Sequence, residues 1–330
     1  MRSQKSSRTF IRLLLLVVTI AAFATLLFNR QYFIDTIIAA QYQPSSEMST
    51  IRDTLDLTDE GKRLFDASQP IIEDASTFNK NCNQHAETNN PILGCYTQQR
   101  IYVYRVTNPE LDGIEQTTAA HELLNAVYER MSDADKATID TALNDAYKKV
   151  TNPELEERME YYRSAEPGQE VNELHSILGT EQMTLPTTLE EHYAKYFVSR
   201  QKIVNFFKQY NSIFTATTNR IKQLQEQINA ETVAVNQRIE RYNAAAASLQ
   251  TDTSTFNARN TSGEFTSQAE FNRERSQLVA RQNELNLERD AIEQQINASQ
   301  QLRSQYNQLV EKYNQLSRSI NSSLDPVPTL

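Results

Sequence analysis

The sequence predicts a mainly α-helical protein with a small β-sheet and an N-terminal membrane anchor. The chain has no tryptophan and only 6 glycines in 330 residues, a composition that disfavours a β-rich architecture. Its last third repeats apolar residues at heptad spacing, which is typical of a coiled coil. Its N-terminus carries an apolar stretch long enough to span a bilayer.

The apolar stretch covers residues 10–28 and is interrupted only by Arg12 and two threonines. Residues 1–9 carry basic side chains and no acid, so the positive-inside rule places them in the cytoplasm and the bulk of the chain outside the cell membrane. A cleaved signal peptide is the alternative. The stretch is long for a signal peptide, and no small-x-small cleavage site closely follows it. We therefore expect a single-pass anchor at 10–28.

Composition also limits the function and the number of domains. The net charge of −9, without a basic patch beyond the anchor, argues against a nucleic-acid partner. About 300 residues outside the membrane suffice for one globular domain and a further element. The expected division is a tail at 1–9, the anchor at 10–28, a juxtamembrane linker at 29–48, a globular domain at 49–200, a helical hairpin at 201–322 and a tail at 323–330.

Cys82 and Cys95 are the two cysteines of the chain. In an exported protein a lone pair at this spacing predicts a disulfide. Closing so short a loop stabilises a fold by roughly 3 kcal/mol in the chain-entropy model. A metal site that uses Cys82 and His85 is the alternative, but it would lack a fourth ligand.

Residues 201–322 are predicted to form an antiparallel coiled-coil hairpin. The second arm has residues seven apart, joined by a companion seam at Leu302, Leu309 and Leu316. The series seven apart is Phe271, Leu278, Leu285, Ile292, Ser299, Tyr306, Tyr313 and Ile320. The first arm advances mostly in threes and fours through Ile221, Leu224, Ile228, Thr232, Val235, Ile239, Tyr242, Ala246 and Leu249. Turn-forming residues at 251–265, with Gly263, are expected to join the arms. Two independent surface helices are the alternative, which sustained heptads disfavour.

The globular region has mixed character. Its β-branched and aromatic residues predict a strand at 101–106, and Leu57-Thr58-Asp59-Glu60 resembles the start of a capped helix. Further helices are expected at 114–131, 133–150, 153–164 and 170–178, and from Leu189 onward.

The first of these later helices contains His121-Glu122-Leu123-Leu124-Asn125. This segment differs by one residue from H-E-x-x-H, in which two histidines hold zinc and the glutamate acts on a zinc-bound water. At 100° per residue, His121 and Asn125 lie together beside the core-facing positions, and Glu122 lies just beyond them. A polar face of an ordinary amphipathic helix is the alternative interpretation.

A strand, this helix and a later Asn172-Glu173-Leu174-His175-Ser176 segment together resemble the gluzincin branch of zinc metallopeptidases over residues 101–180. The chain is also loosely similar to bacterial membrane-anchored proteins with a coiled-coil tail. The similarity rests on its LGCY, IYVY, AAHE, ELHS and GTE segments.

The resemblance implies a zinc cofactor held by His121 and Glu173, with Asn125 at the position of the second ligand. It makes Glu122 the general base. Glu181 is a weaker candidate for the third ligand.

Two further histidines have less defined roles. His175 is two residues from Glu173, so on a helix it points away from that side chain and is expected to pack or to support a ligand. His192 is a candidate donor to a developing oxyanion, with helix capping or packing as the alternative.

Asn125 departs from the family pattern. An amide oxygen is a weak zinc ligand compared with imidazole, and losing one of three protein ligands should lower zinc affinity by several orders of magnitude. Three alternatives remain open. The protein is a pseudoenzyme, or His175 or His192 fills the second position, or Asn125 coordinates zinc within a rigid surround.

The expected function is therefore that of an extracytoplasmic, membrane-anchored metallopeptidase-like protein with weak or no activity. A peptide substrate would extend along residues 102–106. The rival is a structural or adaptor protein of the cell envelope, which binds a protein or cell-envelope partner through its hairpin. Other catalytic motifs, such as a G-x-S-x-G elbow, do not occur in the sequence.

Overall fold

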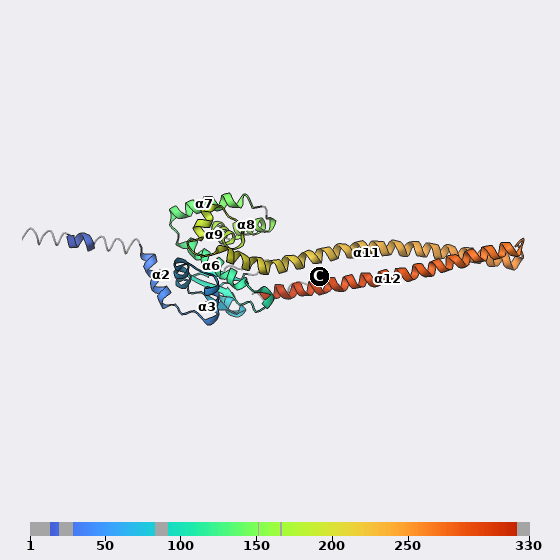
Figure 1. The fold of residues 1–330 in the computed structure, drawn as a ribbon, viewed down its shortest axis with the longest axis horizontal. Coiled ribbons are helices and arrows are strands. Elements are labelled where there is room, and N and C mark those ends of the chain that lie inside the picture. Colours follow the sequence, from blue (N-terminus) through green and yellow to red (C-terminus); the bar gives the residue numbers. More distant parts are fainter. Residues whose placement is uncertain (1–13, 20–28, 83–91, 151, 166, 322–330) are drawn as a thin grey trace, which may run out of the picture. The chain divides into compact units, whose positions relative to one another are not determined.

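The structure, a computed structural model, describes residues 14–19, 29–82, 92–150, 152–165 and 167–321 (Figure 1). It is mainly helical with one small sheet, as predicted. The chain forms two compact units, one comprising residues up to Ile213 with the segment from Leu316, the other Phe214–Gln315.

The helices and strands follow one another with mostly short connections. The helices are α2 (Arg30–Gln41), α3 (Ser46–Thr54), α4 (Asp59–Ala67), α5 (Ala75–Asn81), the 3-10 helix η2 (Pro109–Leu111), α6 (Ile114–Arg130), α7 (Asp133–Tyr147), α8 (Pro153–Ala165), α9 (Glu170–Glu181), α10 (Thr187–Tyr193), α11 (Arg200–Ser262) and α12 (Gln268–Ile320). The strands are β1 (Ile71–Glu73), β2 (Gly94–Thr97) and β3 (Arg100–Tyr104).

The expected anchor at 10–28 is described only over residues 14–19, which are helical and exposed. The rest of that stretch lies outside the described residues. Within the described part of the chain, no helix combines the length and the apolar character needed to cross a bilayer.

The structure differs from the expected linker at 29–48. These residues form α2 and the start of α3, and α2 packs along α4. Asp35 of α2 is only 2% exposed and accepts a hydrogen bond from Nε of Arg130 at 3.2 Å. Its carboxylate also lies 3.7 Å from Arg63 of α4. Arg130 in turn donates to the hydroxyl of Tyr96 at 2.7 Å. A buried ion pair therefore joins α2 to α4, α6 and β2.

In the sheet, β3 is the central strand, with β1 parallel on one side and β2 antiparallel on the other. Tyr102 lies opposite both Ile71 and Cys95. The prediction of a substrate extended along residues 102–106 is therefore wrong where these residues form β3, because both sides of the strand already pair with neighbours.

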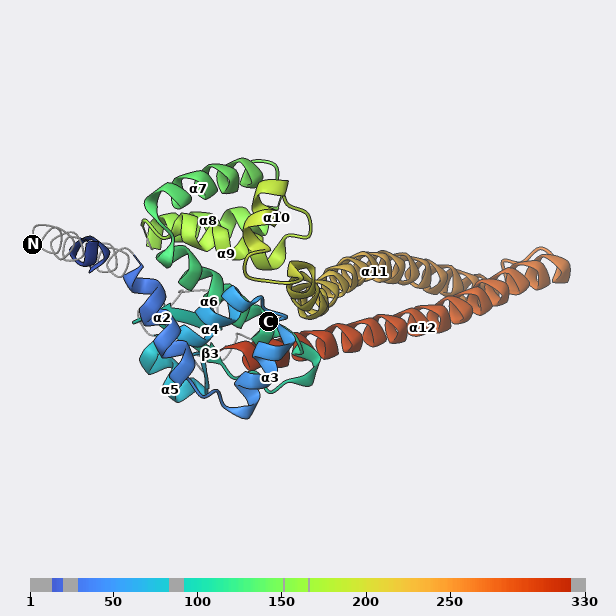
Figure 2. The ribbon, with the colours of Figure 1, turned by 60° about the vertical axis from the view of Figure 1, so that its left-hand side comes forward.

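Helix α6 is the centre of the first unit. It packs against β2 and β3 as well as α3, α4 and α9, and Figure 2 shows it between the sheet-bearing part and the group α7–α10. Its residues Ala120, Leu123, Leu124 and Val127 are buried, at the helical spacing of a core-facing surface, and Met131 just beyond its end is partly buried. The predicted helix start at Thr58 is also confirmed, since its side chain accepts a hydrogen bond from the backbone of Gly61 at 3.0 Å.

The predicted disulfide between Cys82 and Cys95 is present. It joins the end of α5 to β2 and packs with Phe78 and Tyr104 in a small apolar cluster. The alternative of a metal site at Cys82 is therefore wrong, and His85 lies outside the described residues.

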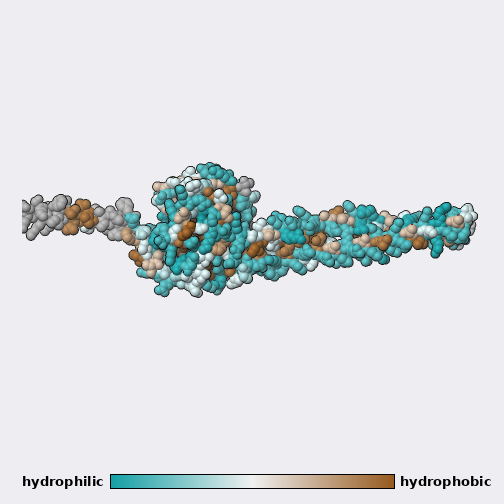
Figure 3. Space-filling view, viewed as in Figure 1, coloured by the Kyte–Doolittle hydropathy of each residue, from teal (hydrophilic) through white to brown (hydrophobic). Residues whose placement is uncertain are grey.

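Helices α11 and α12 run side by side as an antiparallel hairpin, in agreement with the prediction (Figure 1). Seam residues are buried, among them Leu224, Ile228, Val235, Leu249 and Ile292. Ion pairs at Arg238–Glu288 and Arg281–Asp252 link the two arms. The outer surface of the hairpin is mainly hydrophilic (Figure 3).

The predicted connection at 251–265 is wrong in length, because α11 continues to Ser262. Hydroxyls of this segment bond to carbonyls four residues back, as Thr253 does to Leu249 at 2.7 Å, so its polar residues are accommodated in the helix. Gly263, at φ +71°, then ends the helix in a conformation that favours glycine. Phe256 packs against Phe265 and Phe271 and closes the tip.

We predict that Asp35→Asn lowers the free energy of unfolding of the first unit by about 3 kcal/mol, because it leaves the largely buried guanidinium of Arg130 without its counter-charge, whereas Arg63 keeps Glu60. Denaturant titration of the purified chain measures the change. Asp53→Asn is the matched control, since the Asp53 side chain is 71% exposed, and exposed pairs contribute about 0–1 kcal/mol. Equal effects of the two substitutions would contradict the assignment.

Candidate functional site

The candidate site lies where α6 crosses α9. Gly113, at φ +96°, precedes the first residue of α6, and the helix then presents His121, Glu122 and Asn125 within little more than one turn. Glu173 and Ser176, three residues apart on α9, face them from the other side. Glu122 and Asn125 are buried, at 5% and 7% exposure.

These side chains form one hydrogen-bonded network. Nε2 of His121 lies 3.2 Å from a carboxylate oxygen of Glu173. The amide nitrogen of Asn125 donates to Glu122 at 3.1 Å and to Glu173 at 3.4 Å. The amide oxygen of Asn125 accepts a hydrogen bond from the hydroxyl of Ser176. Two distant helices therefore bring together the imidazole, the amide and both carboxylates that the sequence analysis selected.

Strand β2 closes the site from the side of the sheet. A Cβ added to Gly94 would lie 2.7 Å from a carboxylate oxygen of Glu122 and 2.5 Å from Thr118, so a larger residue would have to displace these two side chains. The sheet edge nearest Glu122 is thus β2, whereas the sequence analysis placed a substrate along β3.

Charge within the network favours the protonated form of His121. Burial by itself lowers the pKa of this imidazole, but its hydrogen bond to Glu173 and the charges of Glu173, Glu122 and Glu181 outweigh burial and raise the pKa above its ordinary value. Protonation of His121 completes an ion pair with Glu173, and zinc binds an imidazole only in its neutral form.

The residues at the site do not fit a catalytic zinc. Two atoms bonded to one tetrahedral zinc lie about 3.3 Å apart, so the 3.2 Å between His121 and Glu173 would suit two ligands. A third is lacking, because Asn125 presents its N–H groups to the carboxylates and its oxygen to Ser176. If the side-chain amide of Asn125 were turned by 180°, its oxygen would face the carboxylates of Glu122 and Glu173 and would be repelled by both. Over the described ranges, no group of three His, Cys, Asp or Glu side chains is arranged to hold a metal.

His175 and His192 form a separate buried pair. Their Nε2 atoms lie 2.8 Å apart, and His192 packs on Tyr193 and Tyr196. Both are nearly inaccessible, at 0% and 3% exposure. The Nε2 atom of each imidazole faces that of the other, Nδ1 of His175 has no hydrogen-bond partner among the described residues, and His192 lies among aromatic rings. This arrangement lends no support to either histidine as the second zinc ligand.

Glu181, the weaker ligand candidate, is bound by Arg158 through two hydrogen bonds of 2.9 Å. A bidentate pair of this kind holds both carboxylate oxygens, which removes Glu181 from the candidate ligands.

The roles of Ser176 and Gly94 were not predicted from the sequence. Both stand in quoted segments, ELHS and LGCY, but their partners are distant in sequence. The signal for Ser176 was its spacing of three from Glu173, which puts the two on one face of a helix. Gly94 had no comparable signal, because a glycine before a cysteine also suits an ordinary turn.

Comparison of the chain with protein-family models, with curated proteins and with solved structures found no match in any of the three.

We predict that the first unit loses stability in acid because of the buried histidine pair. Burial, followed by the charge of Lys195, lowers the pKa of His192 to about 4, and burial with the charges of His192 and His121 lowers that of His175. In the unfolded chain these two histidines have a pKa near 6.5. Below that pH the unfolded state therefore binds more protons than the folded state. Stability is therefore complete above about pH 6.5 and falls towards pH 4 by about 1.4 kcal/mol per unit for each fully shifted group.

His192→Gln should flatten this dependence, measured as the free energy of unfolding between pH 7 and 5. His121→Gln is the opposite case. The raised pKa of His121 contributes stability below about pH 6.5 that is lost as pH rises through the folded-state pKa, so this variant should lose its stability selectively in acid. An unchanged pH profile in His192→Gln would contradict the prediction.

Proposed function

We propose that this chain is an extracytoplasmic protein tethered to the membrane by residues 10–28, with a metallopeptidase-like domain that lacks a catalytic zinc. One observation carries the proposal. The amide of Asn125 satisfies Glu122, Glu173 and Ser176 together, so the residue that replaces a zinc-binding histidine stabilises the site without metal.

Supporting geometry comes from the arrangement around the amide. His121 and Glu173 lie 3.2 Å apart on two helices beside a small sheet, which supports a gluzincin-like arrangement. A general base in such enzymes acts on a water that the metal has made acidic. Without metal, Glu122 faces no such water and serves instead as a hydrogen-bond acceptor in the domain.

Metal content tests this proposal. The purified native chain should contain no stoichiometric zinc by mass spectrometry. Asn125→His should gain it, with affinity higher by about 1000-fold or more, on the order of 4 kcal/mol, because an imidazole then stands one turn from His121. Dialysis against zinc followed by elemental analysis measures both.

Glu129→His is the matched control, since it adds an imidazole at an exposed position of the same helix and should not gain zinc. The proposal fails if the native chain holds one zinc that is lost in both His121→Ala and Glu173→Ala.

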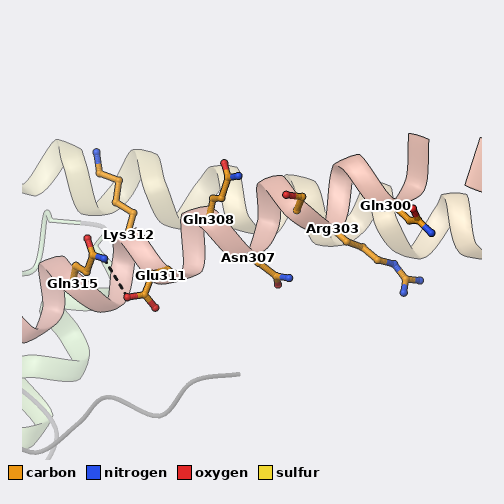
Figure 4. A pocket seen from close by; sticks show the side chains of 8 residues that line it. Gln300, Arg303, Asn307, Gln308, Glu311, Lys312 and Gln315 are labelled. Atoms are coloured by element: carbon orange, nitrogen blue, oxygen red, sulfur yellow. Dashed lines mark hydrogen bonds between the residues drawn. The ribbon is translucent and has the colours of Figure 1, made fainter. Parts of the chain in front are cut away.

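A second candidate function is that of a cell-envelope adaptor acting through the hairpin. One observation favours it. Polar side chains of α12 line a shallow pocket along one face of the helix (Figure 4). They recur at spacings of three and four at Gln300, Arg303, Ser304, Asn307, Gln308, Glu311, Lys312 and Gln315. Gln315 donates to Glu311 at 3.2 Å. Amide side chains together with basic and acidic side chains can form hydrogen bonds and ion pairs with a polar helix of a partner protein that lies along this face.

A photo-crosslinking residue tests the adaptor function in cells. Placed at the exposed Gln308, it should give one discrete protein adduct, whereas placed at the exposed Gln282 of the same helix, outside the pocket, it should give none. Identical adduct patterns at the two positions would contradict a specific partner at this face.

A further inference from the structure

Helix α2 exposes apolar side chains on its outward face. Tyr32, Phe33 and Ile37 are 51%, 40% and 59% exposed. At 100° per residue, Phe33 and Ile37 lie within about 40° of each other, with Tyr32 at the rim. Figure 3 shows tan and brown residues at this end of the first unit. We call Tyr32, Phe33 and Ile37 the α2 patch.

The opposite face of α2 cannot exchange places with the patch. It carries Asp35, which is buried and paired with Arg130 and Arg63. Ile38 lies beside Asp35 and Ile34 lies on the flank between the two faces, and both are half-buried. Turning the helix would expose two apolar residues and separate a buried ion pair. The patch is therefore held outward.

Helix α2 itself carries no acid on its outward face, and the nearby carboxylate of Glu60 on α4 is paired with Arg63. Asp35 is the one acid of the described helix α2, and it points inward. Arg30, at the start of the helix, is exposed. The ring of Tyr32 packs against the guanidinium of Arg63 at 4.4 Å. Aromatic rings, an aliphatic residue and the exposed Arg30 together match the boundary between lipid headgroups and acyl chains.

The position of α2 in the chain indicates what covers the α2 patch. The apolar stretch of the sequence ends at Phe28, and α2 begins at Arg30. A chain that leaves a bilayer at residue 28 has α2 at the membrane surface, because one residue spans under 4 Å. We propose that the α2 patch inserts into the outer surface of the lipid bilayer and holds the first unit against the membrane. This inference rests on the proposed tether.

The absence of tryptophan from the sequence allows a direct test. Phe33→Trp and Ile37→Trp each give the full-length chain a single tryptophan. The chain is reconstituted into phosphatidylcholine–phosphatidylglycerol vesicles, with and without lipids brominated near the headgroup end of the acyl chains. Val198→Trp is the matched control, because Val198 is an exposed apolar residue elsewhere in the same unit, at 67% exposure. Leu16→Trp monitors the tether.

Fluorescence of Phe33→Trp and Ile37→Trp should be quenched by brominated lipid several-fold more than that of Val198→Trp. Quenching no greater than in Val198→Trp, while Leu16→Trp is quenched, overturns the inference and leaves the tether standing. A blue-shifted emission without quenching by brominated lipid also overturns it, because a protein surface then covers the patch. If Leu16→Trp is not quenched either, the tether fails and the inference fails with it.

Discussion

The burial of polar side chains on α6 is the constraint on which the rest of the first unit depends. This helix contacts strands on one side and α9 on the other, so its polar residues cannot rely on bulk water. Buried polar groups must find partners within the protein. Glu122 and Asn125 find them in each other and in α9. The crossing of α6 and α9 is therefore fixed by hydrogen bonds as well as by apolar packing.

Asparagine is well suited to this position for a reason separate from metal binding. Glu122 and Glu173 both approach the amide nitrogen of Asn125, and two carboxylates this close repel each other. The two N–H donors of an amide, with the imidazole of His121 on the far carboxylate oxygen, offset that repulsion. A neutral imidazole in the same place has one N–H donor, so it would serve two carboxylates less well without a cation between them.

The sequence predicted local features more successfully than spatial relations. Periodicity located α6 to α9 and the hairpin, because each signal lies within one element. The convergence of His121 with Glu173 was also predicted, as an implication of the gluzincin resemblance, and it depends on one helix crossing. Errors arose where partners are remote. The strand order, which makes β3 central, depends on β1 and β2, and neither has a strong alternating pattern. The docking of α2 depends on Arg130, 95 residues from Asp35. At the hairpin tip, the many threonines and serines predicted a loop. Composition does not reveal that their hydroxyl groups donate hydrogen bonds to helix carbonyls four residues back.

The disulfide between Cys82 and Cys95 gives β2 a second attachment. If a protease cuts the chain anywhere between the two cysteines, the fragments stay covalently joined and migrate as one species unless a reductant is added. The strand that bears Gly94 would keep its ladder to β3 through Cys95 and Tyr102. Strand β2, which lies beside Glu122, therefore stays attached after a cut in this segment. Whether the polypeptide is intact has to be judged on gels run with a reductant.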